Sequence, residues 1–216
     1  MYINQEGREK STEKRLRIMK CFQEAVRNRR TNYALGREIG VLPSQIIAAV
    51  ESMTKEVPSS FNMQSARVIV AMGEHHEKIW HITKETLRKI VPAEKFAPTE
   101  AKIDGFAAAY GTILFFDETA TVTHMQQQFA AYAENFPIWA QQSNGMLQFA
   151  IWTALTNMGL GVNLQHYNPL IDDEVKQAFQ VPDSWKLIAQ MPFGAQVEPP
   201  KPIEKIAIEE RVKVFR

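Results

Sequence analysis

The segment from Pro58 to Gln64 (Pro-Ser-Ser-Phe-Asn-Met-Gln) carries two hydroxyls and two carboxamides and has no charged side chain. Such groups both donate and accept hydrogen bonds, as the rim of a flat heteroaromatic ring with carbonyl, N–H and bare nitrogen positions requires. The segment lies between an expected helix and an expected strand, and we interpret it as a ring-binding loop. Proline and serine before a strand are also ordinary turn residues, so the segment alone leaves the turn interpretation open.

A second polar segment lies upstream, where Arg29, Arg30 and Thr31 follow an expected helix. Two guanidinium groups and a hydroxyl suit a terminal phosphate, because guanidinium is permanently charged and binds phosphate oxygens in pairs. A cationic helix end that interacts with the helix dipole explains the same residues equally well. Lys201 and Lys205 near the C-terminus could close on the same phosphate, although an exposed surface position is the simpler explanation for a lysine.

Two further segments are weaker candidates for a ligand site. Gln165 and His166 follow an expected strand, where backbone N–H groups can point at a ring nitrogen and an imidazole can buffer a proton. A polar turn before Pro169 is an equal alternative. Phe136 and Trp139 could cap a substrate pocket, but a place in the core or in an interface is the favoured interpretation.

The histidines at positions 75, 76 and 81 do not form a metal-binding pattern. A zinc pair on a helix needs two histidines four positions apart, whereas His76 and His81 are five apart and therefore roughly 140° apart around the helix. We expect no metal site and place these histidines on a helix surface or in an interface. The sequence also contains no P-loop and no Gly-x-Ser-x-Gly nucleophile motif.

Composition indicates a soluble globular protein, since 45% of the residues are apolar, 23% are charged and the net charge is +1. This charge favours neither nucleic acid nor an anionic membrane as a partner, and no run approaches the roughly 18 apolar residues of a membrane span. The single cysteine, Cys21, excludes an internal disulfide framework, fits a cytoplasmic protein and is expected to pack rather than react. Residues 1–18 are expected to be a polar N-terminal extension, and residues 19–216 a single domain.

Hydrophobic spacing, caps and proline positions predict the elements that must position these residues. Residues 144–158 are apolar nearly all round and are expected to form the central buried helix, with Gly159 as its C-terminal cap. Ser44 is expected to cap one helix, and Ile90 to face inward from another. The expected helices are 16–28, 44–56, 74–90, 99–106, 120–132, 144–158 and 172–179, and the expected strands are 67–72, 111–116, 161–164 and 187–191.

The segment Glu198–Pro202 contains three prolines and can be neither a helix nor a central strand. We interpret it as the start of an extended arm that ends in a short strand, Val212–Phe215, and docks on a partner subunit. Together the elements predict an α+β protein in which helices outnumber strands.

Taken in order, these segments resemble the nitroreductase family of FMN flavoproteins. The resemblance covers about residues 19–216 and depends on the order and spacing of several short motifs. Its details are similar to the subgroup of fungal fatty-acid-responsive nitroreductases and bacterial copper-induced nitroreductase. The segments that carry it are 29–31, 58–64, 73–80, 110–116, 158–161, 163–168 and 206–210.

The resemblance implies a nitroreductase-like fold, in which helices wrap a central mixed or antiparallel sheet. It also implies an obligate homodimer with an exchanged C-terminal arm and one FMN in each of two clefts between the subunits. At the matching positions, one subunit would hold the FMN phosphate through Arg29, Arg30 and Thr31, with Lys205 closing from the arm. Tyr33 stands where many relatives place a basic residue, which implies a leaner phosphate site.

The other subunit would line the flavin and the ribityl chain through the first segment described above. The residues at the matching positions are Pro58, Ser59, Ser60, Asn62 and Gln64. Gln165 and His166 match the place where family members approach the reactive face of the flavin near N5.

The function implied by the resemblance is an FMN-dependent NAD(P)H oxidoreductase. It would reduce nitroaromatics or quinones by ping-pong hydride transfer through flavin N5, without an indispensable acid or base of its own. Two alternatives stay open from the sequence. One is a flavin-binding protein of stress or lipid signalling with incidental reductase activity, and the other is a structural dimer on the same fold that has lost FMN.

Overall fold

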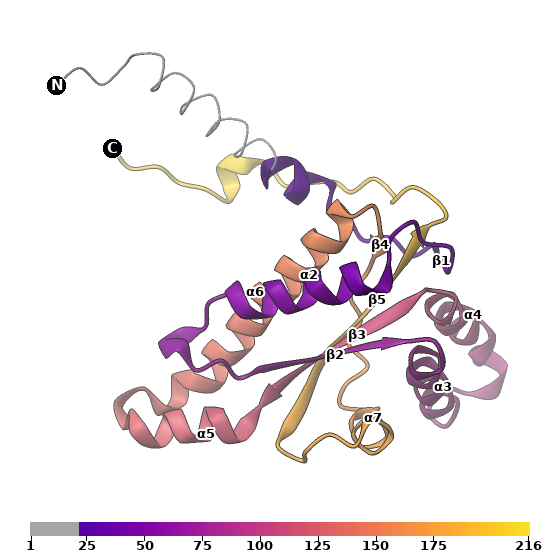
Figure 1. Ribbon diagram of the computed structural model, residues 1–216. Coiled ribbons are helices and arrows are strands. Elements are labelled where there is room, and N and C mark those ends of the chain that lie inside the picture. Colours follow the sequence, from indigo (N-terminus) through magenta and orange to yellow (C-terminus); the bar gives the residue numbers. More distant parts are fainter. Residues whose placement is uncertain (1–21) are drawn as a thin grey trace.

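The computed structural model describes residues 22–216, which form one antiparallel sheet flanked by helices (Figure 1). The order across the sheet is β1 (Leu35–Gly36), β5 (Trp185–Gln196), β3 (Gly111–Glu118) and β2 (Ala66–Met72), with β4 (Gly161–Val162) also paired to β5. β3 is buried along most of its length, because it has a strand on each side and helices on both faces. β2 pairs only with β3 among the described strands, so one of its edges lacks a neighbouring strand.

The helices form two layers, one on each face of the sheet (Figure 1). α2 (Pro43–Glu56) and α6 (Phe136–Asn157) pack on one face, while α3 (Glu74–Arg88), α4 (Phe96–Ala107) and α7 (Asp172–Phe179) pack on the other. The two layers follow from the strand period, since successive side chains of a strand point to opposite faces. On β3, Ile113 and Phe115 contact the first layer and Leu114 and Phe116 the second.

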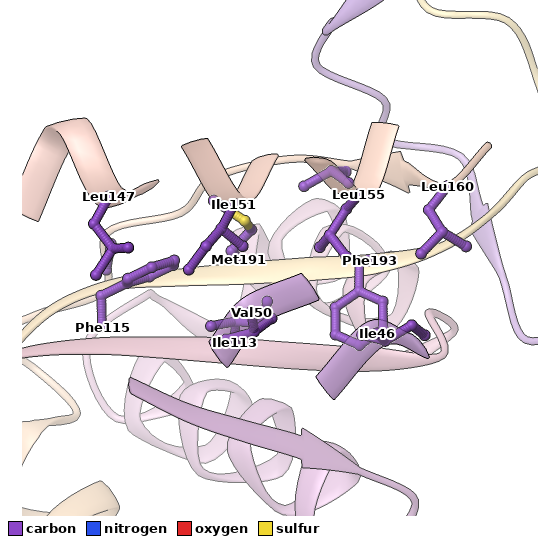
Figure 2. Close-up of a cluster of buried hydrophobic side chains, with 12 residues drawn as sticks. Ile46, Val50, Ile113, Phe115, Leu147, Ile151, Leu155, Leu160, Met191 and Phe193 are labelled. Carbon is purple, nitrogen blue, oxygen red and sulfur yellow. The ribbon is translucent and has the colours of Figure 1, made fainter. Parts of the chain in front are cut away.

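The core beneath α2 and α6 is made of interdigitated aliphatic and aromatic side chains (Figure 2). Burying a side chain of this size stabilises the folded chain by roughly 1.5–3 kcal/mol. Because α6 contributes three of these side chains, the sheet fixes the position of this helix. The labelled residues of this cluster are Ile46, Val50, Ile113, Phe115, Leu147, Ile151, Leu155, Leu160, Met191 and Phe193.

α6 differs from its prediction in both length and burial. It begins at Phe136 rather than at Asn144, because Pro137 lies in the first turn, where proline leaves no helical hydrogen bond unmade. The predicted central buried helix is buried on one face only, since Met146 and Phe149 within 144–158 are exposed, as is Ile138 in the additional N-terminal part. One face of α6 packs on the sheet, and the other bears large apolar side chains that are only partly covered within the described residues.

Several element boundaries also differ from prediction. α4 starts three residues earlier than expected, again with a proline in its first turn, and α5 (Thr119–Gln128) ends before the 3₁₀ segment Ala130–Asn135. The cap of α2 is Leu42 rather than Ser44, and Ile90 is exposed beyond the end of α3. These boundaries depend on local competition between caps and turns, which hydrophobic spacing does not resolve.

The C-terminal arm contains no strand at Val212–Phe215, contrary to the prediction. Instead it has a single 3₁₀ turn, Ile208–Glu210, and otherwise extended chain. A strand needs a neighbour to receive its backbone hydrogen bonds, and within residues 22–216 the arm has none there. In Figure 1 the arm (yellow) leaves the sheet after β5 and ends away from it.

The remaining predictions of type were confirmed, namely the α+β class, the helices around 74–88 and 172–179, and the strands at 67–72 and 111–116. Residues 22–28 are helical, as expected. The expected extension 1–18, the start of the first helix and Cys21 lie outside the described residues. None of the described helices is both long enough and apolar enough to span a bilayer.

Candidate functional site

The cationic patch, defined as Arg29, Arg30 and Thr31, borders a cavity of about 530 Å³. The opposite wall of this cavity is the start of the C-terminal arm, from Glu198 to Ile203. A pairing with Val162 of β4 holds Thr31 at the sheet. The patch therefore lies between the segment that precedes β1 and the segment that follows β5.

Two hydrogen bonds tie the arm to this patch. The Arg30 guanidinium donates to the backbone oxygen of Lys201, and the Asn32 side chain donates to that of Glu198 at 2.9 Å. Asn32 is buried, and its own backbone oxygen accepts a bond from Asn163 at 2.9 Å. The arm is thus anchored at its root, although it is exposed farther along.

The patch concentrates positive charge. The Arg29 guanidinium lies over the Trp152 ring, 4.5 Å from its centroid. Burial, together with the neighbouring charge of Arg30, lowers the pKa of Arg29. An arginine remains charged after such a shift, so two adjacent guanidinium groups share a half-enclosed space, an arrangement suited to an anion with several oxygens.

Tyr33 stands at the edge of the same cavity with an exposed ring. Its ring lies 6.4 Å from that of Phe106, and its phenol is close enough to Tyr167 to influence its titration. Burial, helped by Tyr33, raises the pKa of Tyr167 to about 12. The arm lines the cavity with Lys201 and not with Lys205, which is exposed farther along the arm.

The Pro58 loop, defined as Pro58–Gln64, connects α2 to β2 and borders a separate cavity of about 580 Å³. Pro58, Ser59 and Gln64 line this cavity, whereas Ser60 and Asn62 do not. Its floor is apolar, with Val68 and Val70 from the edge strand β2 and Leu147 from α6. Three charged side chains, Glu51, Lys55 and Arg67, also line the cavity. An apolar floor with neutral hydrogen-bonding groups beside it suits a flat ring.

The loop has an unusual backbone. Phe61, Asn62 and Gln64 have φ angles of 54°, 53° and 49°, in the left-handed region that residues other than glycine seldom occupy. Bonds from Gln64 N–H to the Ser59 hydroxyl (2.9 Å) and from Ser60 N–H to the Ser143 hydroxyl (3.4 Å) hold the loop in this shape. The predicted loop exists, and it is a strained conformation rather than an ordinary turn.

The cationic patch and the Pro58 loop lie on opposite sides of α6 in one chain. The loop contacts Ser143, whereas Arg29 contacts Trp152, nine positions farther along the helix. At about 100° per residue these two positions face opposite ways, and they are roughly 14 Å apart along the axis. One chain therefore does not bring the two groups of predicted site residues together.

Gln165 and His166 have different environments. Gln165 is buried and pairs with Gln190 of β5, and its backbone N–H donates to the Gln190 oxygen at 2.7 Å. That N–H is therefore not free for a ring nitrogen, contrary to expectation. His166 is exposed.

Phe136 and Trp139 belong to an aromatic cluster around Phe61. The Phe61 ring is stacked on Trp139 at 5.7 Å, with an angle of 17° between the planes, and it also contacts Phe129, Tyr132 and Phe136. Phe136 is fully buried, whereas half of the Phe61 side chain is exposed. Only the outer rings of this cluster can meet a ligand.

The prediction that the histidines lie at a surface or in an interface was wrong for His76, which is buried. Its ring bonds to the Thr112 hydroxyl at 2.8 Å and to the Ala107 oxygen at 3.2 Å, and burial lowers its pKa. Within residues 22–216 no cluster of three or more His, Cys, Asp or Glu side chains could hold a metal ion.

Sequence reasoning did not identify a buried polar network next to the Pro58 loop. Asp117, near the end of β3, accepts hydrogen bonds from Asn144 of α6 (3.1 Å) and from Ser65 (3.4 Å). Gln148 in turn donates to Asn144 at 2.7 Å. The available signal was a carboxylate directly after the apolar run 113–116, and a polar Asn and Gln one helical turn apart in an otherwise apolar helix.

Comparison with known proteins places this geometry in a class. The family model described as the nitroreductase family matches residues 26–195. Nitroreductase FRM2 of Saccharomyces cerevisiae is 32% identical over 196 residues, which cover 90% of this chain and 96% of FRM2. The structure of nitroreductase CinD from Lactococcus lactis in complex with nicotinic acid matches with a TM-score of 0.85 and 40% identity, over 90% of this chain and 100% of CinD.

Other structures contain CinD with chloramphenicol and with 4-nitrophenol. The FMN-dependent nitroreductase NfnB from Mycobacterium smegmatis, in complex with NADPH, is only 14% identical and shares the fold, with a TM-score of 0.71 over 92% of this chain and 100% of NfnB. The architecture is therefore the nitroreductase-like α+β fold. The chain belongs to the nitroreductase family of flavoproteins and is an NAD(P)H-dependent oxidoreductase.

Proposed function

We propose that this chain works as a homodimer that binds FMN between the cationic patch of one copy and the Pro58 loop of the other. The observation that carries the proposal is the placement of these two groups on opposite sides of α6. Each is suited to one half of a ligand with a phosphate and a ring, yet one chain keeps them apart. A second copy related by a two-fold axis would supply the missing half to each site.

The residues present fit FMN. The two guanidinium groups and the hydroxyl of the cationic patch match a phosphate. The Ser59 hydroxyl and the Gln64 carboxamide, which line the cavity beside the Pro58 loop, match the polar rim of a flavin, and the apolar floor of the cavity matches the ring face. Tyr33 would keep the phosphate end less positively charged than a lysine or arginine in its place.

Association of two copies is supported by the apolar surface left open in one chain. The outer face of α6 exposes Met146 and Phe149, and the arm exposes Ile206, Val214 and Phe215. The unpaired edge of β2, beside the 580 Å³ cavity, would give the arm of the partner a strand to pair with. The expected strand at Val212–Phe215 would then form only in the dimer.

The proposed reaction reduces a nitroaromatic or a quinone with NAD(P)H. Bound FMN would supply the hydride-accepting ring that the nicotinamide and the acceptor use in turn, so the kinetics would be ping-pong. The protein would hold the ring in place and admit both substrates to the same face. The half-exposed ring of Phe61, stacked on the partly buried Trp139, would offer an aromatic acceptor a stacking surface.

The test is a spectrum followed by turnover. The purified full-length chain should show visible flavin absorbance, or acquire it when FMN is added, and should oxidise NADH or NADPH faster with 4-nitrophenol or a quinone than with oxygen alone. Bound flavin without acceptor-dependent turnover would favour the signalling alternative. A chain that does not bind added FMN would overturn the proposal.

A further inference from the structure

We propose that Asp117 and Asn144 are positioning residues that fix the shape of the Pro58 loop and thereby set its affinity for flavin. This proposal rests on the proposed function, because it concerns the loop assigned there to the ring. Neither residue would touch the ligand. Their action would pass through Ser65, the first residue after the loop.

The loop needs such support because its own conformation is unfavourable. Residues other than glycine are disfavoured in the left-handed region, and the loop contains three of them. Strained backbone of this kind persists only where the surrounding structure holds it. Contacts from the rest of the chain must therefore keep the loop in this conformation.

Adjacent residues of α6 connect to the two ends of the loop. At the start, the Ser143 hydroxyl accepts from Ser60 N–H and donates to the Trp139 oxygen at 2.8 Å. At the end, Asp117 accepts hydrogen bonds from the side chains of Ser65 and Asn144. The Ser65 backbone oxygen accepts from Glu118 N–H at 2.8 Å. The start of the loop is therefore held by α6. Its end is held by the end of β3, to which the next residue of α6 is also bonded.

The geometry at Asp117 is specific. The Ser65 hydroxyl and the Asn144 amide donate to the same oxygen, Oδ1, and the Asn144 amide also donates to the Phe116 oxygen at 3.1 Å. Gln148 occupies the oxygen of Asn144, which fixes the orientation of that amide. Asp117 is 4% exposed, has no salt bridge within the described chain, and its pKa is raised by burial.

A buried polar network can also serve stability alone, and the same strand offers a comparison. At the opposite end of β3, the Thr112 hydroxyl is hydrogen-bonded to the Trp80 ring N–H (2.9 Å) and to the His76 ring (2.8 Å). Thr112 is buried, as Asp117 is. That network contacts α3 and neither group of site residues. Thr112 is therefore a matched control for the loss of a buried hydrogen-bonding centre without an effect on the loop.

The experiment compares Asp117→Asn, Asp117→Leu and Thr112→Val in the full-length chain. The FMN dissociation constant is measured by fluorescence titration, and the melting temperature by calorimetry. Amide hydrogen exchange of residues 59–65 is measured in the flavin-free protein. Asp117→Asn keeps an acceptor at Oδ1, so its dissociation constant should stay within about threefold of the parent value. Asp117→Leu removes the acceptor, and should raise the constant by roughly tenfold or more and speed exchange of the Asn62, Met63 and Gln64 amides.

Thr112→Val should lower the melting temperature while leaving both loop measurements unchanged. If Asp117→Leu changes the loop no more than Thr112→Val does at equal thermal destabilisation, the network is only structural and the proposal is wrong. Equal defects in Asp117→Asn and Asp117→Leu would also overturn it, because charge rather than geometry would then matter. Should Asp117→Leu fail to fold, Ser65→Ala replaces it, with faster loop exchange expected.

The exchange measurement separates this proposal from the proposed function. If the parent chain does not bind FMN, the proposed function fails, while loop exchange in the flavin-free variants still decides whether Asp117 holds the loop.

Discussion

The cationic patch and the Pro58 loop, the two halves of the proposed site, differ in the physical means by which each would hold a ligand. The patch relies on permanent charge on flexible side chains, anchored by the bond from Arg30 to the arm. The loop has no charge, and its shape depends on a strained backbone and on buried hydrogen bonds to α6 and β3. Charge acts over a distance and tolerates small displacements, whereas hydrogen bonds to a ring do not. The patch should therefore determine how strongly an anionic ligand is attracted, and the loop should determine which ring is bound.

Removal of the arm is expected to have the largest effect, because under the proposed function it would separate the two halves of each FMN site. A chain ending at Ile203 keeps the wall of the cationic patch but loses the apolar side chains farther along the arm, Ile206, Val214 and Phe215 among them. We expect a shift from dimer to monomer and loss of flavin, measured by light scattering and by absorbance. The control is Lys205→Ala in the full-length chain, which should remain dimeric. A truncated chain that stays dimeric and binds FMN normally would show that the arm does not complete the site.

Arg30→Ala should have the next largest effect, on the patch alone. A hydrogen bond to a charged group contributes about 1.5–3 kcal/mol, so the FMN dissociation constant should rise roughly ten- to hundredfold. Turnover at saturating FMN should change little, and the difference from the parent should shrink at high salt. Arg27→Ala, at an exposed residue of the helix that precedes Arg30 and outside the cavity lining, is the matched control. A variant that keeps its flavin but loses all activity would contradict this role.

Ser59→Ala should have a smaller effect of a different kind. The hydroxyl accepts the Gln64 N–H, and its loss should weaken FMN binding by about 0.5–1.5 kcal/mol, roughly two- to tenfold. Because no charge is removed, this loss should not depend on salt. Ser52→Ala, on the exposed side of α2, provides the comparison. A salt-dependent loss in Ser59→Ala would break the contrast between the two halves.

The smallest expected effect on the site comes from His76, which lies in neither half. Burial lowers the pKa of His76, so the folded chain binds fewer protons than the unfolded chain below the unfolded pKa of about 6.5. Its contribution to the free energy of unfolding is complete above pH 6.5 and is lost as the pH falls through that value towards the lowered native pKa. His76→Gln should cost about 1–3 kcal/mol at pH 8, where a neutral hydrogen-bonding ring is lost.

That cost should become smaller at pH 5.5, measured by urea unfolding, while the FMN dissociation constant at pH 8 stays at the parent value. A cost that grows on acidification would mean that the buried imidazole is charged in the folded chain.

Prediction from sequence succeeded where the signal is local and failed where it depends on a contact across the fold. The apolar run 111–116 could be read as a buried strand because almost any fold would bury it. The burial of His76 could not be predicted, because its partners Thr112 and Ala107 are more than 30 positions away. The Pro58 loop was predicted from its composition, but its left-handed residues were not, because the hydrogen bonds near them come from Ser143 and, through Ser65, from Asp117, which only the folded chain brings near.

The sequence by itself determined the α+β class and the chemical character of both halves of the proposed site, since charge, hydrogen-bonding capacity and hydrophobic period belong to the residues themselves. The family followed from the resemblance carried by the order and spacing of short motifs. The tertiary structure decided that the two halves lie on opposite sides of α6, that β2 is an open edge and that a buried carboxylate stands behind the loop. These are relations between segments far apart in the chain. They depend on packing against the sheet, which no local pattern contains.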